Sequence, residues 1–207
     1  MDLAEFLASA TGVRLAQAEY ERDLGARLWL ADGADLWKLE RLQHYDETGF
    51  PSWDAFAAGD WAAALRLIDA GRPGFAAFYR EFARHRAVMR RVRIVEEPVP
   101  AYLQWEFHVL RVRAECGERC RVLDATRVDG LAAGRELPDL VSLCGRTLYQ
   151  VCCTDTGQPT GAIRFTDPGL IARYEEFAAA LWESAEDIDA YFRRAIAPLP
   201  PPRPALA

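Results

Sequence analysis

The apolar positions of the first 86 residues recur mostly at helical spacing. Ser52 precedes the apolar run Trp53 to Ala57, which is typical of an N-cap followed by a short helix. Gly59 and Asp60 then predict the end of that helix and the cap of the next, which covers Trp61 to Ala70.

A further amphipathic helix is predicted from Gly74 to Arg86. Its apolar face consists of four aromatic residues at i, i+3, i+4 and i+7, namely Phe75, Phe78, Tyr79 and Phe82. The segment Leu36 to Tyr45 stays open between two structures. Leucines at a spacing of three favour a helix, whereas Trp37 and Tyr45 favour a strand.

The period changes at Val88 and predicts a strand, a helix and a second strand. Val92 to Val95 is a β-branched run that ends before Pro98, which restricts the preceding backbone to extended geometry. Pro100 to Cys116 carries a broad apolar stripe suited to packing on a sheet, and Arg121 to Leu123 follows as the next strand. Together these segments predict a βαβ unit.

The remaining pattern predicts a meander and a long helix. Three short apolar runs, Leu140 to Cys144, Thr147 to Cys153 and Ala162 to Phe165, are separated by residues typical of turns. Asp167 is placed to cap a helix whose first residue is Pro168 and whose apolar residues hold a period of 3.6 as far as Ala185. A restart at Ser184 can extend helix to Arg194.

These segments together predict an α+β fold. We expect a helical N-terminal portion over residues 1–86 and a domain over 87–197, with a mixed sheet and a long C-terminal helix packed on it. Residues 198–207 are rich in proline and are expected to form a disordered tail.

Composition and charge narrow the class of protein. The chain has 207 residues, 51% of them hydrophobic and 27% charged, which is typical of a globular protein. A net charge of −6 makes nucleic acid a possible but unfavoured partner. The N-terminal segment has no pattern of a secretion signal and no stretch is long enough to span a membrane, so we expect a cytoplasmic protein without a membrane partner.

Short motifs give the chain a resemblance to a known family. They are Trp37 to Tyr45, Gly59-Asp60-Trp61, Arg91 to Val95 with Pro98, Tyr102, Leu103 and Glu106, Gly117-Glu118, Leu137-Pro138-Asp139, Gly157 and Gly161. On these residues the segment Leu36 to Phe192 resembles an actinobacterial family catalogued as domain of unknown function 6879. Genes of that family often neighbour helix-turn-helix regulators, so the resemblance implies a regulatory or partner-binding role.

The second half also resembles phospholipase D-type α/β domains. Such enzymes need a histidine and a lysine spaced on a catalytic strand, but Lys38 is the only lysine and no histidine stands two residues before it. Phosphodiesterase chemistry of that type is therefore not expected. The chain also departs from the family pattern at Leu143-Cys144-Gly145, where an aromatic and an acidic residue usually stand.

A dense run of positive charge marks the passage from helix to strand. It contains Arg80, Arg84, His85, Arg86, Arg90, Arg91 and Arg93. Such a run is typical of a solvated face whose positive charges are balanced by Glu81, Glu96 and Glu97. The same arginines could instead bind phosphate, carboxylate or an RNA backbone. Arg91 and Arg93 alternate along the predicted strand and therefore share one face.

Four polar residues lie inside apolar runs and are candidate ligand-binding residues, namely Glu40, Tyr45, Tyr102 and Glu106. Glu106 follows Tyr102 by one helical turn, near the ends of the predicted strands where open sheets bind ligands. The pattern fits either a pocket or polar groups that satisfy one another internally.

The five cysteines, Cys116, Cys120, Cys144, Cys152 and Cys153, lack the paired Cys-x-x-Cys spacing of a zinc site. We expect reduced structural thiols, no metal and no cofactor. Arginines beside Cys116 and Cys120 favour reactivity, but His44, His85 and His108 cannot be paired with either thiol from the sequence.

Two functional hypotheses follow. The first is a non-enzymatic regulatory or partner-binding protein that acts with a helix-turn-helix regulator. The second is an enzyme of specialised metabolism that binds an anionic substrate, phosphate- or carboxylate-bearing and including an RNA-linked one, with Arg91, Arg93, Tyr102 and Glu106. The sequence leaves the catalytic residues and the oligomeric state open.

Overall fold

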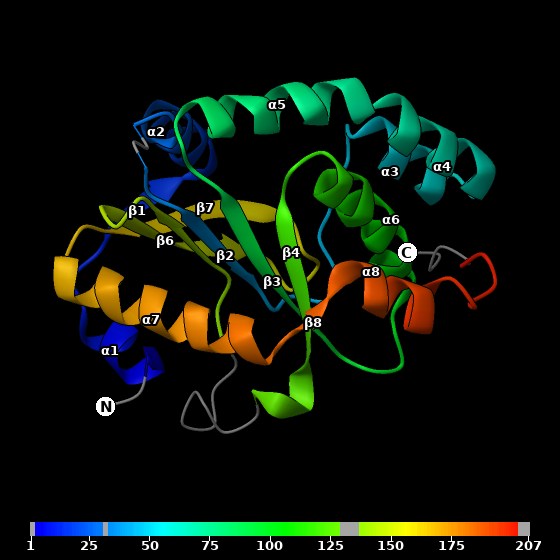
Figure 1. Cartoon of the computed structure of the whole chain (residues 1–207). Helices are drawn as coiled ribbons and strands as arrows, with labels where there is room; N and C mark the ends of the chain where they lie inside the picture. The colour runs from blue at the N-terminus through cyan, green and yellow to red at the C-terminus, as the bar shows by residue number, and fades with distance from the viewer. Residues whose placement is uncertain (1–2, 31–32, 129–136, 203–207) are drawn as a thin grey trace.

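The computed structural model describes residues 3–30, 33–128 and 137–202. Within them the strands form a mixed eight-stranded sheet in the order β1-β7-β6-β5-β2-β3-β4-β8 (Figure 1). The strands are β1 (Val13–Ala16), β2 (Leu36–Glu40), β3 (Met89–Val95), β4 (Arg119–Asp124), β5 (Leu140–Leu143), β6 (Thr147–Cys153), β7 (Pro159–Phe165) and β8 (Glu186–Asp187). Strands β2, β3 and β4 run parallel, and the remaining pairs are antiparallel.

Helices cover both faces of this sheet. They are α1 (Leu3–Ser9), α2 (Gln17–Leu28), α3 (Pro51–Ala57), α4 (Trp61–Ala70), α5 (Arg72–Arg84), α6 (Ala101–Glu115), α7 (Pro168–Ser184) and α8 (Ile188–Tyr191). A 3-10 turn covers Ala125–Arg127 and a π-helical turn covers Phe192–Ile196. Figure 1 shows α1 and α7 on one face of the sheet and α2, α5 and α6 on the other. None of the described helices is long and apolar enough to cross a membrane.

The α+β class is confirmed, and so are the elements with the clearest periodicity. β3, α6 and β4 form the predicted βαβ unit, because β3 and β4 pair in parallel. β5, β6 and β7 form the predicted antiparallel meander. α7 begins at Pro168 as expected, and the Asp167 carboxylate accepts a hydrogen bond from the Leu170 amide at 2.7 Å.

Residues 1–86 contain the expected helices but also two strands, β1 and β2. The ambiguous segment from Leu36 begins as a strand, and β2 lies in the middle of the sheet between β3 and β5. Lys38 and Glu40 lie on the face of β2 opposite to Leu39, where a buried strand usually has apolar residues. The leucines that remain are three residues apart and therefore resemble a helical period. The predicted boundary at residue 86 therefore falls between strands of one sheet.

Two further segments differ from the expectations. Ser52 is not the N-cap of α3, because this helix begins one residue earlier, at Pro51. The buried Ser52 hydroxyl instead accepts a hydrogen bond from the Trp105 indole at 2.9 Å. Residues 198–202 of the proline-rich segment have no helix or strand, and part of them lines a groove with Trp61 and His108. Residues 203–207 lie outside the described residues.

Candidate functional site

A cavity of about 340 Å³ is lined by residues of α6, α2, the loop after β2 and the strands beneath them. Such a volume lies in the range of small-molecule sites. Its charged and polar lining comes from Lys38, Glu40, Tyr45, Glu47, Arg91, Glu106, Arg113 and Asp139. The rest of its wall is apolar or aromatic, with Tyr20, Leu39, Phe50, Trp105, Val109, Leu110, Val141 and Val151.

Arg91, on β3, is held by two carboxylates. Its Nε donates to Glu118 Oε1 at 2.7 Å and its Nη1 donates to Glu40 Oε2 at 2.5 Å. The Lys38 ammonium lies 2.7 Å from the other oxygen of Glu40, and the Tyr79 hydroxyl donates to the other oxygen of Glu118. Every oxygen of these two buried carboxylates therefore has a partner.

The pKa values of both carboxyl groups reflect these contacts. Burial alone would raise the pKa of Glu40, but Arg91, Lys38 and Arg93 outweigh it and hold that pKa well below its usual value. Burial likewise opposes ionisation of Glu118, and Arg91 and Arg113 nevertheless lower its pKa. Both groups therefore stay ionised at neutral pH.

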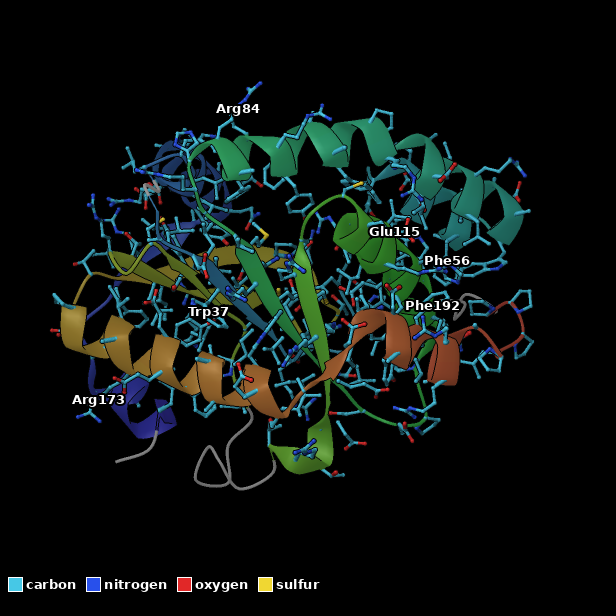
Figure 2. The ribbon with its side chains drawn as sticks, in the orientation of Figure 1. Trp37, Phe56, Arg84, Glu115, Arg173 and Phe192 are labelled. Carbon is cyan, nitrogen blue, oxygen red and sulfur yellow. The ribbon has the colours of Figure 1, made fainter. Side chains whose placement is uncertain are left out.

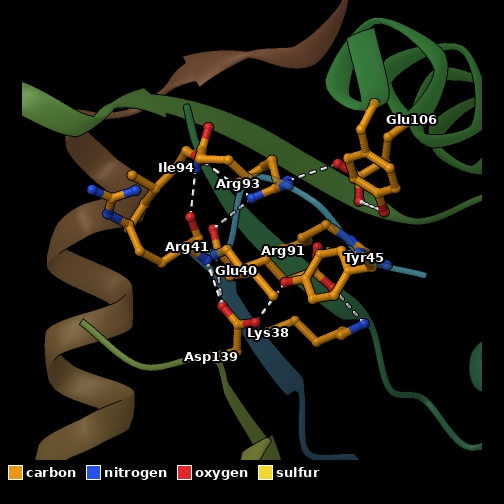
Figure 3. A network of polar contacts seen from close by, with 12 residues as sticks. Lys38, Glu40, Arg41, Tyr45, Arg91, Arg93, Ile94, Glu106 and Asp139 are labelled. Atoms are coloured by element: carbon orange, nitrogen blue, oxygen red, sulfur yellow. Dashed lines mark hydrogen bonds and ion pairs between the residues drawn. The ribbon is translucent and has the colours of Figure 1, made fainter. Parts of the chain in front are cut away.

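Arg93, two residues along the same face of β3, is fully buried. Its Nε donates to Glu106 Oε2 at 2.8 Å, and its Nη1 lies 3.2 Å from the Ile94 carbonyl oxygen (Figure 3). The Tyr102 hydroxyl donates to Glu106 Oε1 at 3.2 Å. The Arg93 Nη2 atom is buried and has no acceptor among the described residues. The guanidinium is thus anchored on two sides, with one nitrogen unsatisfied.

A tyrosine and an aspartate close the cavity near the end of β2. The Tyr45 hydroxyl donates to Asp139 Oδ2 at 2.6 Å, and Asp139 Oδ1 accepts from the Arg41 amide at 2.6 Å (Figure 3). Burial, followed by Glu40 and Asp139, raises the pKa of Tyr45 well above its usual value. Asp139 and Val151 also line a second groove of about 500 Å³ at this end of the sheet. Asp139 and Val151 therefore lie between the cavity and that groove.

The structure brings the six predicted ligand-binding residues together. Glu40, Tyr45, Arg91 and Glu106 line the cavity, whereas Arg93 and Tyr102 contact Glu106 from behind. The sequence pattern fitted either a pocket or polar groups that satisfy one another. Both descriptions hold, because these groups bond to one another and also form a wall of the cavity. The rest of the arginine run is more exposed. Arg84 points away from α5 and pairs with Glu81, as a solvated face predicts (Figure 2).

A family model described as domain of unknown function (DUF6879) matches residues 26–193. The chain belongs to this family. No curated protein matches the chain. Over 89% of its length the DUF6879 chain is similar to the solved structure of TrmBL2, an archaeal chromatin protein described as showing a novel mode of DNA binding, with 10% identity. The TM-score is 0.39 and the chain spans 58% of that structure, so the likeness carries no argument for function.

The sequence did not predict Glu47 and Arg113 as residues of the DUF6879 cavity. Within the described residues, neither of them forms an ion pair. Glu47 Oε1 lies 3.4 Å from the Tyr102 hydroxyl, and burial, followed by Glu106 and Glu40, raises its pKa. The Nε atom of Arg113 is buried without an acceptor, and its guanidinium lies 5.3 Å from the Phe75 ring centroid.

A pattern in the sequence could have found Arg113. Glu106, Val109, Leu110 and Arg113 recur at i, i+3, i+4 and i+7 and share the cavity face of α6. No comparable pattern exists for Glu47, which lies in the loop between β2 and α3.

The thiols of the DUF6879 chain are not part of the cavity lining. All five cysteines are free, and none of them lines it. Burial, followed by Glu118, raises the pKa of Cys120 well above its usual value, and burial raises that of Cys153 to about 11. Within the described residues, no three His, Cys, Asp or Glu side chains gather as a metal ion requires.

Proposed function

We propose that the protein is a non-enzymatic regulatory protein that takes a small molecule into the cavity and acts on a protein partner, a helix-turn-helix regulator. One observation carries the ligand-binding part of this proposal, and the partner is the one that the family resemblance implies. The charged groups of the β2 and β3 wall, Glu40 and Arg91, are bonded to one another, and they are also bonded to Lys38 and Glu118. A wall held in this way is pre-organised, so a ligand that enters it orders few side chains and binds more tightly.

The same contacts make acid–base catalysis by the β2 and β3 wall unfavourable. A general acid or base needs a pKa near the working pH, whereas the pKa of Glu40 is held low and that of Tyr45 is raised. The described lining contains no cysteine, serine or histidine that would serve as a nucleophile or base.

An enzyme acting on an anionic substrate through Arg91 and Arg93 is less well supported. Both guanidinium groups already face carboxylates at 2.5–2.8 Å. An incoming phosphate or carboxylate would have to displace Glu40, Glu118 or Glu106 and leave a buried charge without its partner, which is strongly destabilising. Arg91 and Arg93 are therefore better explained as supports of the cavity wall.

A thermal-shift screen of small metabolites, followed by calorimetry on the hits, tests the proposal. Val151→Phe fills the cavity from β6, and Val13→Phe places the same larger side chain on exposed β1 as a matched control. We expect hits that stabilise the wild type and Val13→Phe but not Val151→Phe. Binding that Val151→Phe leaves intact, a screen without hits, or conversion of a bound hit into a product would refute the proposal.

The partner is tested separately by co-purification with a helix-turn-helix regulator encoded beside the gene. We expect a complex whose affinity changes when a hit is added, because a ligand that binds two states unequally shifts their populations. A regulator that does not bind in the presence or absence of any hit would refute the regulatory part.

A further inference from the structure

Glu47 and Arg113 lie at opposite ends of the cavity. Glu47 is beside Glu106, since the Tyr102 hydroxyl lies 3.4 Å from Glu47 and 3.2 Å from Glu106. Arg113 follows Glu106 by seven residues on the same face of α6, which corresponds to about 10 Å along a helix axis. The cavity therefore has one acidic and one basic end.

Neither end forms an ion pair within the described residues, and the carboxylate that acts on Arg113, Glu118, is already bound by Arg91 and Tyr79. The other charged groups of the lining have near partners, because Glu40 binds Lys38 and Arg91, Glu106 binds Arg93, and Asp139 accepts from Tyr45 and the backbone. Glu47 has a long contact to a hydroxyl, and Arg113 has a ring beside it. Each is thus available to a group of opposite charge from a ligand.

The stretch between the two ends is apolar. Val109 and Leu110 lie between Glu106 and Arg113 on α6, and Trp105, Phe50 and Val151 line the same cavity. Such walls favour a hydrocarbon or aromatic segment, because burial of apolar surface is favourable.

From this placement, and on the basis of the proposed function, we infer that the ligand is a zwitterion of the amino-acid or short-peptide class. Its ammonium group binds Glu47, its carboxylate binds Arg113, and an apolar segment joins them. The guanidinium fork matches a carboxylate in two-point contact, and a buried cation is stabilised by an unpaired carboxylate.

The balance of charge favours a carboxylate over a phosphate at the basic end. The lining carries three cations, Lys38, Arg91 and Arg113, against four carboxylates, Glu40, Glu47, Glu106 and Asp139. A phosphate monoester, with a charge of about −1.5 to −2 at pH 7, would add to this negative excess. A zwitterion leaves the excess unchanged and places each of its charges against an unpaired opposite.

Isothermal titration calorimetry with three probes tests the inference. The probes are ω-aminooctanoate, which carries both charges, and octanoate and octylamine, which carry one each. We expect ω-aminooctanoate to bind the wild type at least about ten-fold more tightly than either single-charge probe, because a second charge-assisted contact forms. Val151→Phe should abolish binding of all three probes.

Charge-neutral variants give a crossed pattern. In Glu47→Gln, ω-aminooctanoate should lose its advantage over octanoate but keep its advantage over octylamine, and Arg113→Gln should show the reverse. Arg113→Lys, which keeps the charge, should retain part of the preference. The matched controls are Arg111→Gln, on α6 but outside the cavity, and the exposed Glu97→Gln. Both controls should bind like the wild type, and thermal melts verify that every variant is folded.

The outcomes separate this inference from the proposed function. The zwitterion inference would be wrong if single-charge probes bound as tightly as ω-aminooctanoate, or if the variants did not show the crossed pattern. Binding that Val151→Phe abolishes would still identify the cavity as a binding site. No binding of any probe would overturn the zwitterion too, and the metabolite screen would then decide the proposed function by itself.

Discussion

Replacing Arg93 by methionine tests whether the buried ion pairs hold the cavity wall in place. The substitution removes the guanidinium but keeps most of the length of the side chain. Glu106 then keeps only the Tyr102 hydroxyl at 3.2 Å, while its side chain is 9% exposed. An ionised carboxylate in this position has lost its counter-charge but has little access to water.

The expected loss is large. Breaking a buried pair by removing one partner costs about 3–5 kcal/mol, and removing the unsatisfied Nη2 atom offsets part of it, so we expect about 3 kcal/mol. The double variant Arg93→Met with Glu106→Leu removes both charges of this pair and should recover most of the loss. The two substitutions are therefore expected to be strongly non-additive.

Urea unfolding monitored by circular dichroism and tryptophan fluorescence measures both effects. With a slope of about 2–3 kcal/mol per M, the midpoint of Arg93→Met should fall by about 1 M or more. Arg84→Met is the matched control, since its pair with Glu81 is exposed and should contribute at most about 1 kcal/mol. Additive losses below about 1 kcal/mol for Arg93 and Glu106 would refute the reasoning, because the pair would then behave like one at the surface.

Three further predictions concern pH, thiol reactivity and the tail. The folded-state pKa values of Glu40 and Glu118 lie below their usual 4.5, so the contribution of both groups to stability is complete above about pH 4.5 and is lost as the pH falls. In acid-unfolding curves, Glu118→Gln should therefore show a smaller loss of stability with falling pH. Cys120, whose pKa burial raises, should resist iodoacetamide at pH 8 in the native protein and react on unfolding, and mass spectrometry of native labelling would contradict this if Cys120 were modified early. Truncation after Ala197 should shift the melting temperature by less than about 2 °C, since Leu199 is 39% exposed; a drop beyond about 4 °C would show that the tail contributes to the fold.

The sequence predicted those elements that carry a clear apolar or β-branched pattern. In α6, β4 and α7 the apolar residues hold their period, and β3 shows a β-branched run although Arg91 and Arg93 are buried on one of its faces. β2 has Lys38 and Glu40 on one face, where the buried Glu40 pairs with Arg91 of β3 and the half-buried Lys38 pairs with Glu40. The information that makes β2 a central strand is thus in another segment.

The candidate site was predictable to the same extent. Arg91, Arg93, Tyr102 and Glu106 belong to one strand and the helix that follows it, and neighbours in sequence of this kind are often neighbours in space. Glu47 comes to the cavity through the loop after β2, whose position depends on Asp139 near β5. Such long-range placement leaves no local pattern in the chain.

The central position of β2 has a consequence for the order in which the protein assembles during synthesis. The Arg41 amide and Asp139, which tie the end of β2 to the segment before β5, are 98 residues apart. Until the ribosome has released residues 140–143, one long edge of β2 has no partner, and unpaired strand edges are templates for aggregation. We therefore expect nascent or truncated chains that end before β5 to depend on chaperones, whereas the finished chain covers that edge with its own meander.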